Sequence, residues 1–510
     1  MSERLNIDPV KLKAYFLRQF SLLDFRLPPL LLLLLVALPP VSAKTVTVGK
    51  GSGAIDVSSQ KMLGLEEGDT VVIAKGTYSG GTFTNLTGIT IVPEAPGVTF
   101  NGPITIGHDS KVTFDGISKS KKPSTDDAKP KEPIYGYTFS GFDGPGFTPT
   151  GHCEDLTIKG AAFLNIGCGV DGAGNIITYK GTPDTTLFNN LTLDTIKLTG
   201  KTAAYVGTWD IEPTYHNVNI GMTIKNVIVI NDGTGPATKV LAHSLYKLTI
   251  DNWRITGPTL VDIGDTAIFV IWGNATIKNV YRSGGWGYIT RLSEVGLGEP
   301  AESYIYNVID VNSVCFGMVD NQVLIGLCKP DAPIPLFGGN LHVYNVTSGN
   351  KTTMVHYLTC LVVLGGEFDG KTYYTTEIKN CFVFNVVQGK DLKGMNNILQ
   401  FSGGAGARFT EENNLEVKGP VPPTYFIDKD KFYPRKGSPL IAKGVAIPMI
   451  TTDIYGNPRS TPPDVGAVEH IDGMPEPDPI TDNTPDAQFS TNDYSVDPTN
   501  TAPVPYRVKR

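Results

Sequence analysis

The sequence lacks several features that would place it in a common functional class. Basic residues are not in excess: 43 Lys and Arg stand against 50 Asp and Glu, and the net charge of −7 argues against nucleic acid as a partner. Long stretches with an apolar period of 3.6 residues are scarce, and no Cys/His spacing resembles a zinc site. What remains is 56 Gly, 37 Pro and many short Val-, Ile- and Thr-rich runs, which predict a mostly β protein.

Cysteine is also sparse, with six residues at positions 153, 168, 315, 328, 360 and 381. Six cysteines allow 15 disulfide connectivities, and an exported chain could form them. Cys381, however, occupies a repeat position that holds valine elsewhere, so we expect it to pack inside as a small apolar residue.

The N-terminus has the order of a secretory signal. Basic residues precede the apolar run 30–38, and small residues lead to Ala43. The run is short for a membrane span, which takes about 20 residues. We therefore predict a signal segment over 1–43, a secreted or cell-surface protein, and no membrane insertion once the signal is removed.

A short pattern returns throughout the middle of the chain: a β-branched residue, any residue, then Asn. It first occurs clearly as "MTIKNVIV" (222–229), and its intervals are 26, 27, 28, 38 and 35 residues. Gly160 and Thr195 hold the same place in two earlier stretches. A recurrence of 20–50 residues is the mark of a solenoid. The Asn positions are Asn226, Asn252, Asn279, Asn307, Asn345 and Asn380.

The repeated Asn has a physical role in a solenoid of stacked strands. Alternate strand residues face the same way, so Ile224 points inward and Lys225 outward. Asn tolerates the left-handed backbone of a sharp bend, and its amide can bond to copies above and below at the ~4.8 Å strand spacing. We predict an asparagine ladder inside a corner of the coil, with Asn345 buried. Too few hairpin signals argue against a β-propeller, and leucine-rich spacing is absent.

These features resemble the right-handed parallel β-helix of the pectate-lyase type, whose corners carry such ladders. The segment "EEGDTVVIAKGTYSGGTF" (66–83) is similar to the opening turn of many secreted β-helix proteins. The resemblance implies an all-β, right-handed, single-stranded parallel β-helix over residues 44–425.

The end of the chain resembles the segment that closes many bacterial surface β-helix proteins. Residues 426–470 contain "GSPLIAKG", "DIYGNPR" and "DVGAVE". Asp453, Arg459, Asp464 and Glu469 could form an acid pair or a metal site. An Arg–carboxylate tie that caps the last coil is the favoured interpretation. Residues 471–510 are rich in Pro and Asp and predict a disordered tail.

Catalytic signatures of this fold are missing. The N-T-D, D-D, G-H-G and R-x-K pieces of polygalacturonase-like hydrolases are absent, as are the W-x-D-H and R-x-P-x-x-R pieces of pectate lyases. No convincing esterase set is present. β-Elimination would still be possible with one base and one cation that neutralises a uronate.

Candidate site residues lie on the strands that precede the ladder asparagines. His243, Tyr288, Arg291 and His356 are the catalytic candidates. Trp272, Trp286 and Tyr357 are candidates for stacking on sugar rings. No cofactor is predicted, although calcium stays open at four oxygen-bearing residues: Asp210, Glu212, Asp262 and Asp265.

The sequence therefore predicts a secreted or surface protein that is a monomer and whose partner is a polysaccharide. Two functions stay open. One is a polysaccharide lyase or glycoside hydrolase that acts on acidic glycans. The other is a non-catalytic adhesin or structural glycan-binding protein.

Overall fold

The computed structural model divides the chain into Met1–Lys44 and Thr45–Arg510, and every element below belongs to the second unit. The structure describes residues 43–117, 133–171, 188–200, 220–230, 240–244, 246–256, 267–271, 274–283, 288–292, 302–311, 319–321, 339–349, 367–368, 371–372, 374–384, 408–417, 421–428 and 430–477. The predicted signal segment and most of the predicted tail lie outside them. A search of these residues finds no helix long and apolar enough to cross a membrane.

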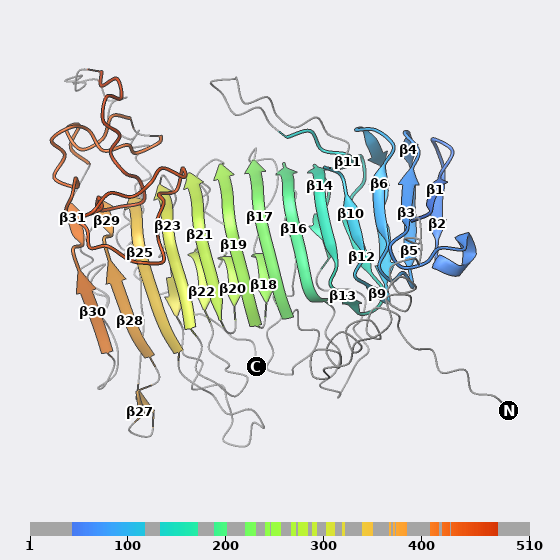
Figure 1. The fold of residues 1–510 in the computed structure, drawn as a ribbon, viewed down its shortest axis with the longest axis horizontal. Coiled ribbons are helices and arrows are strands. Elements are labelled where there is room, and N and C mark those ends of the chain that lie inside the picture. Colours follow the sequence, from blue (N-terminus) through green and yellow to red (C-terminus); the bar gives the residue numbers. More distant parts are fainter. Residues whose placement is uncertain are drawn as a thin grey trace, which may run out of the picture. The chain divides into compact units, whose positions relative to one another are not determined.

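Most strands belong to one 20-stranded sheet in which every pairing is parallel (Figure 1). Its N-terminal strands are β1 (Thr45–Val48), β3 (Thr70–Ile73), β4 (Thr77–Tyr78), β6 (Thr90–Pro93), β7 (Val98–Phe100), β9 (Asp109–Ser110), β10 (Thr113–Asp115), β11 (Tyr137–Ser140), β13 (Cys153–Glu154) and β14 (Thr157–Leu164). Its later strands are β16 (Phe188–Thr199), β17 (Ile220–Ile230), β19 (Tyr246–Thr256), β21 (Ala275–Ser283), β23 (Glu302–Val311), β25 (Gly339–Gly349), β28 (Tyr374–Lys379), β29 (Phe382–Phe384), β30 (Arg408–Glu412) and β31 (Leu415–Val417).

Two smaller parallel sheets alternate with the large sheet along the chain. The first holds β2 (Ala54–Val57), β5 (Gly80–Thr84), β8 (Ile104–Gly107), β12 (Pro145–Pro149) and β15 (Cys168–Val170). The second holds β18 (Val240–Ser244), β20 (Ala267–Ile271), β22 (Tyr288–Leu292) and β24 (Val319–Asn321). The remaining elements are the antiparallel pair β26 (Glu367–Phe368) and β27 (Lys371–Thr372), and the 3-10 helix η1 (Gln60–Leu63).

Each long strand of the large sheet bends at one residue. In β17 that residue is Asn226, with φ 55°. Met222 and Ile224 are buried before the bend, and Val227 and Val229 are buried after it, so one left-handed residue shifts the in–out alternation by a single position. We call the part before the bend the first leg and the part after it the second leg. Successive coils repeat this unit, which confirms a parallel β-helix; its right-handed sense stays a prediction.

All six ladder asparagines have φ between 53° and 56°, and Gly160 and Thr195 take the same bend, as the sequence predicted. Side-chain bonds join the asparagines in pairs, with Nδ2–Oδ1 distances of 2.8, 3.1 and 3.0 Å for Asn226–Asn252, Asn279–Asn307 and Asn345–Asn380. The ladder is confirmed, but its place inside the corner is not. Asn226 and Asn252 are exposed because a residue at the outer side of the bend points away from the core.

The interior of the coils is apolar. In the first coils aromatic rings stack along the axis, with centroids 5.2 Å apart for Phe100–Phe139 and 4.9 Å apart for Phe139–Phe163. Cys381 is fully buried in this core, as expected, and Cys153 and Cys168 are unpaired. The other three cysteines lie outside the described residues.

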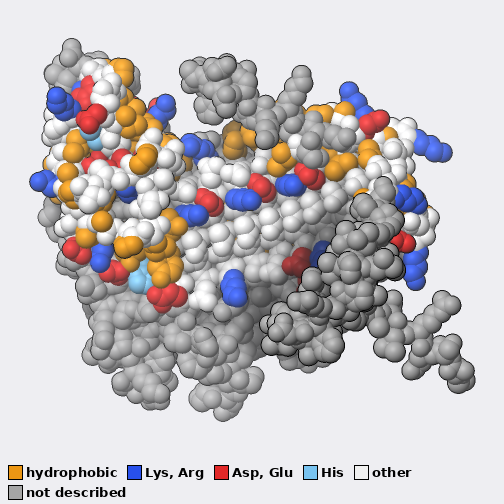
Figure 2. Space-filling model, viewed as in Figure 1, with side chains coloured by type: hydrophobic (Ala, Val, Ile, Leu, Met, Phe, Trp, Pro, Cys, Tyr) orange, Lys and Arg blue, Asp and Glu red, His pale blue; other side chains and the backbone are white. Residues whose placement is uncertain are grey.

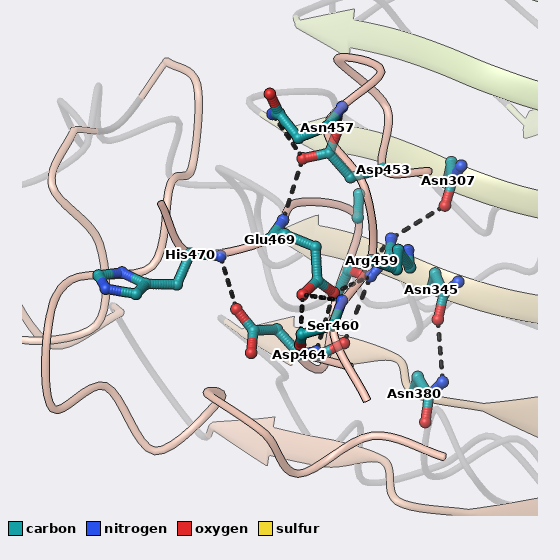
Figure 3. Close-up of polar contacts among 12 residues, drawn as sticks. Asn307, Asn345, Asn380, Asp453, Asn457, Arg459, Ser460, Asp464, Glu469 and His470 are labelled. Carbon is teal, nitrogen blue, oxygen red and sulfur yellow. Dashed lines mark hydrogen bonds and ion pairs between the residues drawn. The ribbon is translucent and has the colours of Figure 1, made fainter. Parts of the chain in front are cut away.

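The closing segment (426–470) packs on the outside of the last coils and is fixed to the ladder by Arg459 (Figure 3). Its guanidinium donates to Glu469 Oε1 at 2.8 Å and to Asn307 Oδ1 at 2.9 Å. Asn380 donates to the carbonyl of Val445 and accepts from its N–H, both at 2.8 Å. These contacts confirm that Arg459 ties the segment to the coils together with a carboxylate, whereas capping of the last coil stays a prediction. They cover Asn307 and Asn380, which are buried.

Candidate functional site

One column of outward-facing residues runs along the first legs. Nine successive coils place threonine there, each paired in register with the next: Thr45, Thr70, Thr90, Thr113, Thr157, Thr192, Thr223, Thr249 and Thr276. We call this set the threonine column. The next three positions are Tyr304, His342 and Glu377, and Thr410 follows them. Cross-strand pairs of β-branched residues stabilise a sheet, so sheet stability accounts for the column but not for its interruption.

The three interrupting residues contact one another. The Tyr304 ring stacks on the His342 imidazole with centroids 4.6 Å apart and an interplanar angle of 11°. His342 Nε2 lies 2.8 Å from Glu302 Oε1, and its Nδ1 lies 3.2 Å from Glu377 Oε2 and 2.9 Å from the Tyr344 hydroxyl. With acceptors at both ring nitrogens, the imidazole can donate two hydrogen bonds only in its protonated form.

Three neighbouring side chains bind the Glu377 carboxylate. It accepts hydrogen bonds from Tyr344 and His342, and Lys379 Nζ lies 2.5 Å from its Oε1. Burial raises the pKa of Glu377, but hydrogen bonds from Lys379, Tyr344 and His342 outweigh burial and lower the pKa to about 2. Glu377 is therefore a permanent carboxylate at neutral pH.

The pKa values of Lys379, Tyr304 and Tyr344 are all raised. The hydrogen bond to Glu377 raises the pKa of Lys379, which also lies 3.4 Å from Glu412. Burial, together with Glu302, raises the pKa of Tyr304. Burial and Glu377 raise the pKa of Tyr344 well above its ordinary range. Each of these groups keeps its proton at neutral pH and so acts as a hydrogen-bond donor.

The closing segment forms one side of the site. Ile450 packs against Tyr306 and Tyr344, which are 9% and 5% exposed, and Ile447 and Tyr304 extend this contact. Glu302, at 43% side-chain exposure, and His342, at 19%, stay accessible beside it. The site is thus a partly open surface in which an aromatic ring, an imidazole, two carboxylates and an ammonium lie together.

Such a set of groups suits recognition of a polyhydroxylated ring. A tyrosine ring offers an apolar face with a polar edge, the carboxylates accept hydrogen bonds, and Lys379 donates them. Abstraction of a proton is a poorer fit, because His342 is bonded at both nitrogens and the pKa values of Tyr304, Tyr344 and Lys379 are raised. Within the described residues, no three His, Cys, Asp or Glu side chains are grouped so as to hold a metal.

The residues expected from the sequence lie elsewhere. His243 is in β18, and Tyr288 and Arg291 are in β22; only their backbones are described. His243 and Arg291 occupy one register row through Val270, which Asp320 extends, whereas Tyr288 pairs with Ala267. The other candidates lie outside the described residues: Trp272, Trp286, His356, Tyr357, and the possible calcium ligands Asp210, Glu212, Asp262 and Asp265.

Sequence reasoning missed the Tyr304 site although the signal was present. Three residues before each bend, the sequence reads Thr in the coils of Asn226, Asn252 and Asn279, and then Tyr, His and Glu in the next three coils. The predicted candidates His243, Tyr288 and Arg291 lie on strands that precede a ladder strand, whereas this site lies at outward positions of the ladder strands themselves.

Three solved structures show a distant likeness to the chain. Pectate lyase Pel9A has a TM-score of 0.34 and 11% identity, covering 84% of this chain and 98% of its own. The PL6 family alginate lyase AlyGC has a TM-score of 0.31 and 10% identity, covering 84% of this chain and 59% of its own. Pectate lyase Bsp165PelA from Bacillus sp. N165, solved with trigalacturonate, has a TM-score of 0.21 and 10% identity over 76% of this chain and 89% of its own.

No protein-family model and no curated protein matches the sequence. At such low TM-scores the likeness to solved structures establishes neither the fold nor an activity. The β-helix assignment therefore rests on the strand pairing, and the function on the site.

Proposed function

We propose that this protein binds a polysaccharide, and that the surface formed by Tyr304, His342 and Glu377 is its recognition site. The single observation that carries the proposal is the interruption of the threonine column at three successive coils by residues that contact one another. We further propose that the protein acts outside the cell, as its N-terminal sequence predicts.

The chemistry of the site supports binding. The Tyr304 ring is available for stacking against the apolar face of a sugar. Glu302 and Glu377 accept hydrogen bonds from sugar hydroxyls, and Lys379 donates them. The tyrosine hydroxyls, whose protons go to Glu302 and Glu377, can accept hydrogen bonds from the sugar. Contacts of this kind give affinity without bond cleavage.

The test is affinity electrophoresis of residues 44–510 in gels that contain xylan, mannan, chitin derivatives, pectate or alginate. Wild-type protein is expected to be retarded by at least one polysaccharide, and Tyr304→Ala and Glu377→Gln are expected to lose that retardation. Lys50→Ala, at an exposed position of the opening coil, is the control and should behave as wild type. Equal retardation of all four proteins would contradict this site, and no retardation in any gel would contradict the function.

Cleavage of an acidic glycan, by a lyase or a hydrolase, is the second candidate function. It is favoured by one observation: His243, Arg291 and Asp320 share a register row in the sheet of β18–β24. A base and a cation at one row are what β-elimination needs. A joint rise of unsaturated product and reducing ends on pectate or alginate, abolished by Arg291→Ala, would establish a lyase. Reducing ends alone would indicate a hydrolase.

A further inference from the structure

The threonine column leads directly to the proposed recognition site. Thr276 pairs in register with Tyr304, and Thr249, Thr223 and Thr192 precede it in successive coils. Each of these threonines is partly exposed between two buried neighbours, so the hydroxyls lie on the outer surface at the ~4.8 Å strand spacing. The column and the site are therefore continuous parts of one face.

The positions two residues further along each strand carry charges of alternating sign. They run Asp115, Lys159, Asp194, Lys225, Asp251 and Lys278, each in register with the next. The charges pair with their neighbours at 3.0 Å (Lys159–Asp115), 3.3 Å (Lys225–Asp194) and 3.1 Å (Lys278–Asp251). Figure 2 shows this alternating row of blue and red crossing the face beside an uncharged band.

This pattern indicates which class of ligand the face can bind. Three cations and three anions alternate, so the row has no net charge, and a polyanion gains no long-range attraction from it. Threonine hydroxyls both donate and accept hydrogen bonds, as sugar hydroxyls do. A straight row of such hydroxyls offers the same contact once per coil to a polymer that lies parallel to the stack.

We propose that the threonine column from Thr192 to Thr276 is an extended binding surface for an uncharged linear polysaccharide, which lies along the coil stack and places one sugar on Tyr304. This inference rests on the proposed function and adds to it the ligand class and the direction of the chain. The column also stabilises the sheet, so the test has to separate a lost hydroxyl from a weakened sheet.

The experiment compares a trisaccharide with an octasaccharide of the same neutral glycan, by calorimetry, with xylo-, manno- and chito-oligosaccharides as the probes. The variant Thr192→Val/Thr223→Val removes two hydroxyls that lie three and four coils from Tyr304, and it keeps the β-branched shape that the strands require. Thr105→Val/Thr148→Val is the matched control, because these threonines also pair in register on an outer face but in the sheet of β2–β15.

We expect wild-type protein to bind the octasaccharide more tightly than the trisaccharide. Thr192→Val/Thr223→Val should weaken octasaccharide binding by about tenfold, the effect of two lost hydrogen bonds, and leave the trisaccharide, which reaches only Thr276 and Thr249 from Tyr304, unchanged. The control should change neither. If the octasaccharide gains nothing over the trisaccharide, or the variant binds it as wild type does, the extended surface is wrong while Tyr304→Ala can still confirm the recognition site. If no neutral probe binds but pectate retards the protein, the ligand class is wrong; if nothing binds, the proposed function fails as well.

Discussion

The first nine coils and the three that follow them use the same backbone for different purposes. From β1 to β21 the first legs carry threonine and, beside it, paired charges or apolar residues. From β23 to β28 the backbone and ladder bend are retained, but Tyr304, His342 and Glu377 replace threonine, and Tyr306 and Tyr344 replace the charges. The side chains of these later coils are fitted to contacts outside the coil.

The two replaced columns serve different contacts. Tyr306 and Tyr344 lie under Ile450 of the closing segment, so their change from charged residues to tyrosines is explained by packing. Tyr304, His342 and Glu377 lie beside that contact and stay partly accessible. Packing under the closing segment thus explains one of the two changes. The other, at Tyr304, His342 and Glu377, is the one that we propose serves a ligand.

The largest expected effect of a single substitution on stability concerns Arg459 in the closing segment. Arg459 is almost fully buried and bonds to Glu469 and Asn307. Arg459→Ala leaves the Glu469 carboxylate buried without its partner, which should lower the free energy of unfolding by about 3–5 kcal/mol. Urea denaturation measures this loss, and Lys443→Ala, at an exposed position of the same segment, should change it by less than about 0.5 kcal/mol. A loss below 1 kcal/mol in Arg459→Ala would contradict the role given to this residue.

The second effect compares two rungs of one ladder. Asn380 and Asn252 adopt the same bend, with φ of 56° and 55°, but Asn380 is fully buried under the closing segment and Asn252 is exposed. Alanine at either place takes on the left-handed backbone at a cost of about 1–2 kcal/mol. Asn380→Ala also leaves Val445 groups unsatisfied, which adds about 1–3 kcal/mol. Equal losses of unfolding free energy in the two variants, measured by denaturation, would show that the contacts of Asn380 with the closing segment do not contribute to stability.

The third effect is a dependence of stability on pH. The folded pKa of Glu377 is lowered to about 2, below its ordinary value, so its contribution is fully present above about pH 4.5 and is lost as pH falls towards 2. With allowance for solvent screening, we expect this contribution to be about 1–2 kcal/mol. Glu377→Gln should flatten the fall of unfolding free energy between pH 4.5 and 2 by that amount. An unchanged slope would show that the contacts of Glu377 are too weak to favour its ionised form.

The smallest effect is expected in the charge row. Lys225 is 44% exposed and pairs with Asp194 at 3.3 Å. Lys225→Gln should change the free energy of unfolding by no more than about 0.5 kcal/mol, because exposed ion pairs contribute little and salt screens them. A larger change in the free energy of unfolding at low salt would contradict this prediction and show that the charge row stabilises the fold.

The fold was largely predictable from the sequence because the same short pattern recurs in each coil. Asn226 and its equivalents mark a bend, and the residues on either side alternate in burial. The outward position of the asparagines was not foreseen, because one left-handed residue shifts the alternation and the sequence pattern alone does not show on which side of the bend that residue lies.

The site was less predictable. Tyr304, His342 and Glu377 are separated by 38 and 35 residues, and only the register brings them together. Once strands are aligned on their bends, however, the change from threonine to these three residues is visible in the sequence itself. The contribution of Ile447 and Ile450 could not be predicted, because it depends on how the closing segment packs.

The most direct test of the central claim restores the column at two of its three interruptions. Tyr304→Thr/His342→Thr continues the pattern of the first nine coils and keeps Glu377 as the partner of Tyr344 and Lys379. Unfolding free energy and retardation by the polysaccharide that binds wild type are measured on the same preparation. Our account predicts a stability within about 1 kcal/mol of wild type, as for other surface changes, together with loss of binding. A variant that binds as wild type does, whatever its stability, would contradict the claim that this interruption serves a ligand.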